Sequence, residues 1–290
     1  MRILITGREG QVARSLAEHA GSNHELVFAA RPQFDLKDPA SIEAFVAKAR
    51  PDLVINAAAY TAVDRAEDEP AVAFAINAEA PATLADAARK VGAPIIHLST
   101  DYVFEGSLDR PYVEEDPVAP IGVYGRSKLA GEEAIRASGA EYLIMRTAWV
   151  YSPFGNNFVK TMLRLAADRE SLTVVNDQFG NPTSALDIAD ALLVVADAWG
   201  SKKEAGNSTY HFAGSGETNW ADFARHIFSS SARSGGPSSD VQGIPSSAWP
   251  TKAARPGNSR LDCGKFSQTF GHSAPDWQTS ADEVVRRLLS

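Results

Sequence analysis

Short apolar segments alternate with amphipathic segments through the first half of the chain. The apolar segments cover residues 3–5, 25–30, 53–56, 94–98 and 142–146. Helical patterns lie between them, at residues 11–20, 39–49, 71–91 and 127–138. Strands that are buried on both faces give continuous apolar runs, as these do. The alternation of strand and helix predicts an α/β fold with a doubly wound parallel sheet and helices on both faces.

The pattern changes after residue 151. Helices are expected at residues 157–167, 186–199 and 220–229, strands at 172–175 and 210–213, and a loop at 230–247, which is rich in Ser, Gly and Pro. The 290 residues suffice for one large domain and a smaller lobe. We expect a dinucleotide-binding domain at 1–150, to which 176–212 partly return, and a smaller α/β substrate-binding lobe at 151–175 and 213–290.

Composition narrows the classes of function. A net charge of −8 argues against general nucleic-acid binding, although it allows a nucleotide ligand. The lone Cys263 excludes an internal disulfide and a cysteine metal cluster, and the six histidines show no metal-binding spacing. The start of the chain does not resemble a signal peptide, and no run reaches the roughly 18 apolar residues of a membrane span. We therefore expect a cytoplasmic protein without membrane contact.

A glycine-containing turn follows the first apolar segment and precedes the first helix. Gly7 and Gly10 would let the backbone approach a pyrophosphate at the helix N-terminus, beside Gln11 and Val12. Ala13 occupies the position that needs a small residue for packing of helix on strand. An ordinary tight turn is the alternative, but the position after the first strand favours a Rossmann-type dinucleotide site.

The residues after the second apolar segment bear on the choice of cofactor. An acidic residue there binds the ribose 2′-hydroxyl, whereas an arginine favours a 2′-phosphate. Arg31 lies near this place, and Asp35 and Leu36 follow it. This favours NADPH, with NADH possible, although Arg31 could equally be a solvated loop cation.

Residues 56–64 close the third strand. The small side chains around Ala58 and Ala59, followed by Tyr60 and Thr61, would let this loop lie along the cofactor. A tightly packed strand end is the alternative. The acidic residues that follow do not converge on one helix face, so we expect a solvated helix start and no metal site; they are Asp64, Glu67, Asp68 and Glu69.

Tyr124 and Lys128 are spaced so that both side chains lie on one face of a helix. A phenol has a pKa of about 10, and a neighbouring ammonium, helped by a cationic nicotinamide ring, would lower it. Thr100, at a strand end, could hold the same reacting oxygen. This set suits proton transfer to a carbonyl during hydride transfer.

Four further residues are candidates for contact with the substrate. Asp101 could orient the substrate or serve as a second acid, or simply cap a loop. Trp149, after the fifth strand, could flank a sugar ring or belong to the core. Arg255 and Arg260 lie in a basic loop and could pair with a substrate phosphate or with surface acids.

Together, residues 56–64, 99–104, 177–183 and 255–261 resemble the dTDP-4-dehydrorhamnose reductases of the extended short-chain dehydrogenase/reductase superfamily, over nearly the whole chain. The resemblance implies reduction of the 4-keto group of dTDP-4-dehydro-L-rhamnose to dTDP-L-rhamnose with NADPH or NADH. It implies that Tyr124 is the general acid, that Lys128 lowers its pKa and binds the nicotinamide ribose, and that Thr100 hydrogen-bonds the carbonyl. Asp101 and Trp149 would touch the sugar.

Position 102 separates this family from related sugar-nucleotide dehydratases. Those enzymes carry an Asp-Glu pair after the threonine, whereas this chain has Asp101-Tyr102, which disfavours elimination of water. Some relatives hold Mg²⁺ with glutamates at a dimer interface. Ser15 and Leu186 stand where two of these would be, so a metal-bridged dimer is not expected, and monomer or homodimer stays open.

Two other functions are compatible with the pattern. One is a non-catalytic regulatory subunit resembling that of methionine adenosyltransferase, and the other is a reductase or epimerase of a different nucleotide sugar. The presence of Thr100, Tyr124 and Lys128 favours catalysis.

Overall fold

A parallel β-sheet forms the centre of the larger domain in the computed structural model, which describes residues 1–201 and 206–290. Its strands lie in the order β10-β5-β4-β3-β1-β2, and all of their pairings are parallel. The strands are β1 (Arg2–Thr6), β2 (Glu25–Ala29), β3 (Leu53–Asn56), β4 (Ile95–Thr100), β5 (Tyr142–Thr147) and β10 (Ser208–His211). The predicted doubly wound sheet is thus confirmed.

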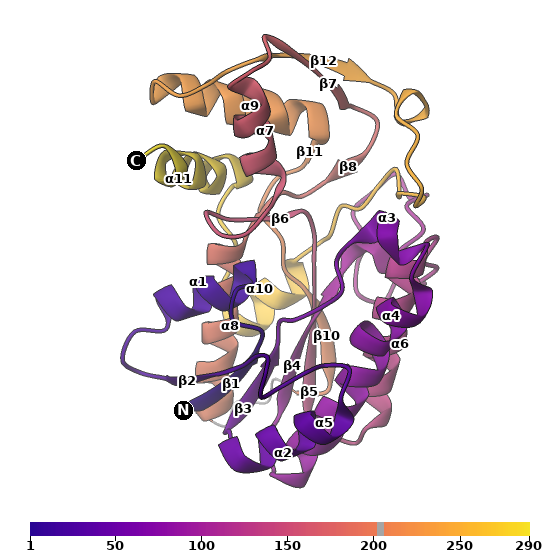
Figure 1. Cartoon of the computed structure of the whole chain (residues 1–290), viewed down its shortest axis with the longest axis vertical. Helices are drawn as coiled ribbons and strands as arrows, with labels where there is room; N and C mark the ends of the chain where they lie inside the picture. The colour runs from indigo at the N-terminus through magenta and orange to yellow at the C-terminus, as the bar shows by residue number, and fades with distance from the viewer. Residues whose placement is uncertain (202–205) are drawn as a thin grey trace.

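Helices cover both faces of the sheet (Figure 1). Leu4 and Val54 point to the face covered by α2 (Pro39–Ala49) and α5 (Ala80–Lys90), where α6 (Val123–Ala137) also packs. Ile3 and Ile5 point to the other face, against α1 (Gln11–His19) and α8 (Ala185–Gly200). Successive side chains of a strand alternate between faces, so each strand contributes to two hydrophobic layers.

A smaller lobe lies beyond the carboxyl ends of the strands, at the top of Figure 1. Its core is formed by α7 (Phe158–Ala166), β7 (Ser171–Val175), α9 (Trp220–Arg233) and α11 (Trp277–Leu289). By contrast, α10 (Gly264–Phe270) packs on β10 and α8 of the larger domain, although it lies within 213–290. Within the range 176–212, α8 packs on the sheet and β10 forms its edge strand. The division into two domains stays a prediction.

The stretch 230–247 is not the loop that its composition predicts. Helix α9 continues to Arg233, and β12 (Asp240–Ile244) pairs in parallel with β7. Ser231 is buried and donates a hydrogen bond to the carbonyl of Pro237 at 2.6 Å, so the serine-rich end of the helix has partners. Backbone pairing with β7 determines β12, and this is not visible in the local pattern of side chains.

The segment expected as one helix at 71–91 consists of three helical pieces. It contains α4 (Pro70–Phe74), a π-helical turn η1 (Ala75–Glu79) and α5. The remaining elements are α3 (Val63–Ala66), η2 (Asp101–Val103), β6 (Val150–Tyr151), β8 (Phe179–Gly180), β9 (Thr183–Ser184), β11 (Thr218–Asn219) and η3 (Ser246–Ala248). Within residues 1–201 and 206–290, none of the helices has both the length and the apolar character that crossing a bilayer requires.

Helix α6 starts at Val123, four residues before the predicted start at Ser127, so Tyr124 lies in its first turn. The backbone N–H of Val123 donates a hydrogen bond of 2.8 Å to the carboxylate of Glu67. An acceptor at this position satisfies one of the free N–H groups of a helix start. The acidic run predicted to be only solvated thus supplies a distant cap to the helix that carries Tyr124 and Lys128.

Candidate active site

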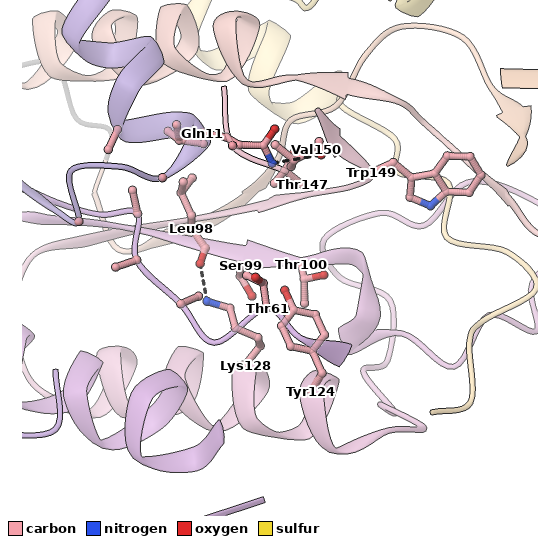
Figure 2. Close-up of a pocket in the computed structure, with 18 of the residues that line it drawn as sticks. Gln11, Thr61, Leu98, Ser99, Thr100, Tyr124, Lys128, Thr147, Trp149 and Val150 are labelled. Atoms are coloured by element: carbon pink, nitrogen blue, oxygen red, sulfur yellow. Dashed lines mark hydrogen bonds between the residues drawn. The ribbon is translucent and has the colours of Figure 1, made fainter. Parts of the chain in front are cut away.

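A cavity of about 660 Å³ lies at the carboxyl edge of the sheet (Figure 2). Strands β1, β3, β4 and β5 all end at this edge, where parallel α/β sheets bind ligands. Most of the candidate cofactor residues line this cavity, together with the candidate catalytic residues: Gly7, Gly10, Gln11, Val12, Ala58, Ala59, Thr61, Thr100, Tyr124 and Lys128.

The turn between β1 and α1 forms one wall of the cavity. Gly7 has a φ of +82°, in the left-handed region that favours glycine, and its N–H donates to the carbonyl of Ala29 at 2.8 Å. At the helix start, Gly10 provides no capping side chain, and its Cβ position would be open, with no atom within 4 Å from described parts of the chain beyond its immediate neighbours. The N–H groups of the first turn of α1 therefore face an open space that an anionic group could fill.

Four other candidate cofactor residues are not among those that line the cavity. Arg31 is exposed beyond the end of β2. Asp35 accepts the N–H of Lys37, and Leu36 packs into the core layer below α2. Tyr60 donates its hydroxyl hydrogen bond to Glu69 at 2.8 Å. Their contact with a cofactor stays a prediction.

Tyr124, Lys128 and Thr100 lie close together. Tyr124 and Lys128 project from α6 into the cavity, and Thr100, at the end of β4, lies opposite the Tyr124 ring (Figure 2). Burial raises the pKa of Tyr124 to about 12, although a hydrogen bond with Thr100 acts in the opposite direction. In the protein alone, burial and the negative charge of Asp101 raise this pKa and outweigh the Thr100 hydrogen bond. A lowering by Lys128 together with a bound nicotinamide stays a prediction.

The ammonium of Lys128 is buried beside β4. It donates a hydrogen bond of 2.6 Å to the carbonyl of Leu98, which Figure 2 shows as a dashed line. Burial lowers the pKa of Lys128 to about 8, against the attraction of Glu132. Both Tyr124 and Lys128 thus carry their protons at neutral pH.

Asp101 is a buried acidic residue that lines the cavity. It is 2% exposed, and burial raises its pKa to about 6 against the hydrogen bond from Thr100. Its Oδ1 accepts the Thr100 hydroxyl at 2.8 Å, whereas its Oδ2 has no partner within residues 1–201 and 206–290. A buried acceptor with a free oxygen suits the binding of a hydroxyl from a ligand.

Trp149 lies on a second wall of the cavity with a φ of +47°. Its ring is stacked on Trp220, with centroids 3.5 Å apart, and its Nε1 donates to Ser259 at 3.2 Å. A Cβ on Gly180 would lie 2.5 Å from the indole, so the neighbouring chain leaves room only for glycine. Trp220, at the start of α9, is a cavity residue that the sequence analysis did not identify.

A second cavity of about 880 Å³ adjoins the first, and Trp220 lines both. Its walls come from α7, β7 and residues 246–255 of the smaller lobe, and they include Arg255. The Arg255 guanidinium donates to the carboxylate of Asp64 at 2.6 Å, which joins this segment to α3. Asp64 is thus an ion-pair partner and not only a solvated acid.

Arg260 forms its hydrogen bonds away from both cavities. Its guanidinium donates to Glu217 at 2.9 Å and to the carbonyl of Asp109 at 2.6 Å, and it is not among the residues that line either cavity. Of the two candidate arginines, the structure therefore brings only Arg255 toward the site.

Within the described part of the chain, no group of three or more His, Cys, Asp or Glu side chains has an arrangement that could hold a metal ion. Ser15 donates to the carbonyl of Gln11 at 2.9 Å, and Leu186 is buried in the smaller lobe's core.

Comparison with known proteins gives matches over the full length. The family model described as "RmlD substrate binding domain" matches residues 1–290. A dTDP-4-dehydrorhamnose reductase of Sinorhizobium fredii is 46% identical, with 100% of this chain and 98% of the relative covered. The crystal structure of a dTDP-4-dehydrorhamnose reductase of Clostridium acetobutylicum has a TM-score of 0.93 at 37% identity and covers 100% of both chains. That of Bacillus anthracis, in complex with NADP, has a TM-score of 0.90 at 33% identity and covers 98% of both.

Proposed function

Because the chain belongs to the RmlD family of dTDP-4-dehydrorhamnose reductases, we propose that it reduces the 4-keto group of dTDP-4-dehydro-L-rhamnose to give dTDP-L-rhamnose. The observation that carries this proposal is the placement of Tyr124, Lys128 and Thr100 beside the glycine turn, in one cavity. A hydroxyl that can donate a proton, a buried cation and an anion-binding turn are the groups that reduction of a ketone by a nicotinamide requires.

NADPH is the cofactor that we propose, with NADH as the alternative. The related enzyme of Bacillus anthracis is in complex with NADP. In this chain, the open space over Gly10 and the uncapped N–H groups of α1 fit a pyrophosphate, and residues 57–59 line the same cavity. When bound, the nicotinamide supplies the hydride.

The protein supplies the proton and the orientation. The phenol of Tyr124, with a pKa of about 12, is protonated at neutral pH and donates to the carbonyl oxygen as negative charge develops there. The Thr100 hydroxyl, which donates to Asp101 in the structure, turns to donate to the same oxygen when the substrate is bound. The Lys128 ammonium stabilises the resulting phenolate and holds the nicotinamide ribose. Asp101, through its free Oδ2, accepts a sugar hydroxyl, and Trp149 packs against the sugar ring.

The second cavity is where we place the nucleotide end of the substrate. It shares Trp220 with the cofactor cavity, so one extended ligand can pass from one to the other. Arg255 lines it, and a guanidinium is suited to bind a diphosphate. The aromatic and aliphatic side chains of Phe158, Met162 and Trp249 would pack against a base.

Oxidation of NADPH, followed by its absorbance with dTDP-4-dehydro-L-rhamnose as substrate, tests the proposed function. We expect turnover that depends on both reactants, and faster turnover than with UDP- or GDP-linked 4-keto sugars. Tight binding of NADPH without oxidation on addition of any of these sugars would contradict the enzymatic proposal. A preference for another nucleotide would correct the substrate alone.

Replacement of Arg255 by glutamine should raise the KM for the dTDP sugar about ten-fold and leave kcat and the KM for NADPH nearly unchanged. A hydrogen bond to a charged group contributes about 1.5–3 kcal/mol, and 1.4 kcal/mol is a factor of ten. Steady-state kinetics measure the effect. R260Q is the matched control, because Arg260 is bound elsewhere, and D64N separates loss of the ion pair from loss of the substrate contact. Equal effects in R255Q and R260Q would exclude the assignment.

A further inference from the structure

A chain of buried polar groups connects Lys128 with the cofactor turn. The Lys128 Nζ lies 3.3 Å from the Nε2 of His97, on β4, and the Nδ1 of His97 lies 2.9 Å from the side-chain amide of Asn56, on β3. Asn56 is hydrogen-bonded to the hydroxyl of Thr6 at 2.8 Å, and that hydroxyl accepts the N–H of Ala58 at 3.0 Å. His97 and Asn56 are direct neighbours in the register of the sheet, and both are at most 1% exposed.

The ammonium of Lys128 determines which nitrogen of His97 carries the proton. An ammonium has donors only, so the Nε2 that faces it must be an acceptor, and the hydrogen of the neutral ring must be on Nδ1. In the structure the Asn56 NH₂ faces Nδ1 and the Asn56 oxygen accepts the Thr6 hydroxyl, an arrangement that leaves both ring nitrogens facing donors. The Nδ1–H ring therefore requires a half-turn of the amide, which places the Asn56 oxygen on Nδ1–H and the NH₂ on the Thr6 oxygen. Burial and the charges of Lys128 and Arg136 hold the pKa of His97 well below its ordinary value, so the ring stays neutral.

The other charged groups near Lys128 are engaged elsewhere. Glu132, one turn further along α6, accepts hydrogen bonds from Arg146, Arg136 and Ser99. In residues 1–201 and 206–290, Lys128 itself has hydrogen-bond partners only in the Leu98 carbonyl and His97. Of these two, His97 is the only side chain.

We propose that His97 is a positioning residue for the reaction: its neutral imidazole, fixed by Asn56 in the Nδ1–H tautomer, accepts a hydrogen bond from Lys128 and holds the ammonium toward the cofactor. This inference rests on the proposed function, since it explains what orients the Lys128 ammonium toward the cofactor. Through Thr6, the same chain holds the N–H of Ala58 on the cavity wall. The cation and the two loops beside the cofactor are thereby fixed with respect to one another.

The tautomer is tested directly on the wild-type protein. Imidazole ¹⁵N NMR, with the His97 signals assigned by their absence in H97Q, should show a neutral Nδ1–H ring from pH 7 down to pH 5. An Nε2–H ring or a charged ring at pH 7 would overturn the proposal. This measurement requires neither sugar nor turnover, so it is independent of the proposed function.

Two substitutions test the role. Glutamine at position 97 can place an amide oxygen near the position of Nε2, whereas asparagine reaches only as far as Nδ1. We expect H97N to bind NADPH about ten-fold more weakly than wild type at pH 8, since it loses a hydrogen bond to a charged group. Loss of an acceptor destabilises the ammonium and lowers the pKa of Lys128. The alkaline limit, the pH above which NADPH binding weakens because Lys128 loses its proton, should therefore be about one pH unit lower in H97N. H97Q should keep wild-type values within about three-fold.

Fluorescence titration of NADPH binding between pH 6 and pH 9 measures these effects, and kcat with the keto sugar follows the same order if the proposed function holds. H211N is the matched control, because His211 is a buried histidine on β10 whose Nδ1 is bonded to the carbonyl of Tyr112. It should not move the alkaline limit. Identical curves for wild type and H97N, or equal shifts in H97N and H97Q, would overturn the proposal.

Discussion

Replacement of Tyr124 by phenylalanine is expected to lower kcat by about 10²–10⁴-fold, the range typical for loss of a general acid. The substitution removes the hydroxyl that we propose as the proton donor and leaves the ring in place. Because the pKa of Tyr124 is about 12, the phenol holds its proton throughout the neutral range, and no other side chain is assigned to replace it. Single-turnover reduction of the dTDP-linked keto sugar measures the effect.

NADPH affinity provides the first control for this variant. Lys128 and the glycine turn are unchanged in it, so the Kd for NADPH should stay within about three-fold of wild type. Tyr102 provides the second, since its ring packs edge-on against Tyr124 at 5.6 Å and lines the same cavity. Y102F should keep a rate at least about ten-fold above that of Y124F. A near-normal rate for Y124F would refute its role as the acid.

Local patterns in the sequence were sufficient for the central sheet and for much of the cavity. Strands that are buried on both faces have continuous apolar runs, so they can be found from the sequence. The strand at 53–56 and the helix at 39–49 have the predicted bounds. The glycine turn lies on the cavity wall, because its position after the first strand determines where it is in a doubly wound fold. Tyr124 and Lys128 meet there, since a spacing of four on one helix leaves little freedom.

Contacts between distant parts of the chain could not be predicted in this way. Glu67 caps a helix that starts 56 residues later, and Trp220 stacks on Trp149 from another lobe. The pKa of Tyr124 has the same origin. The sequence shows the lysine nearby, but the burial that raises the pKa depends on the whole fold around the ring. Strand β12 depends on its pairing with β7, which side-chain periodicity does not encode.

Replacement of Glu132 by glutamine is expected to cost about 3–5 kcal/mol of the free energy of unfolding, because it leaves the buried charge of Arg146 without its counterion. The side chains of Glu132 and Arg146 are 0% and 3% exposed, and two hydrogen bonds of 2.9 and 2.7 Å join them. A net stability of 5–15 kcal/mol is usual, so this loss would be a large fraction of the total. Denaturant unfolding at pH 7 measures it.

The exposed pair of Glu43 and Lys90 is the matched control, with side chains 51% and 57% exposed. E43Q should cost less than about 1 kcal/mol, since solvent screens such pairs. If E132Q costs as little as E43Q, the buried pair does not stabilise the fold in the way that we argue.

The pH dependence of the E132Q effect identifies its electrostatic part. Burial alone would raise the pKa of Glu132, but the hydrogen bonds and charge of Arg146 outweigh it and hold this pKa below its ordinary value. A carboxyl with a lowered pKa stabilises the fold fully above the pKa of the unfolded chain, about 4.3, and the effect disappears as the pH falls through the folded pKa. The difference between wild type and E132Q should therefore be constant around pH 7 and shrink only in acid.

A double replacement by apolar side chains separates the value of the ion pair from the cost of breaking it. In E132L/R146M both charges of the pair are removed together, so most of the stability that E132Q loses should return. The buried Lys128 still loses the attraction of Glu132, so the return should be incomplete. Activity should not return with it. Glu132 also accepts the hydroxyl of Ser99 at 2.6 Å, and Ser99 lies on the cavity wall directly before Thr100. A variant of near wild-type stability that is slower would show that Glu132 serves the site, through Ser99 at the end of β4 and through its attraction for Lys128, more than it stabilises the fold.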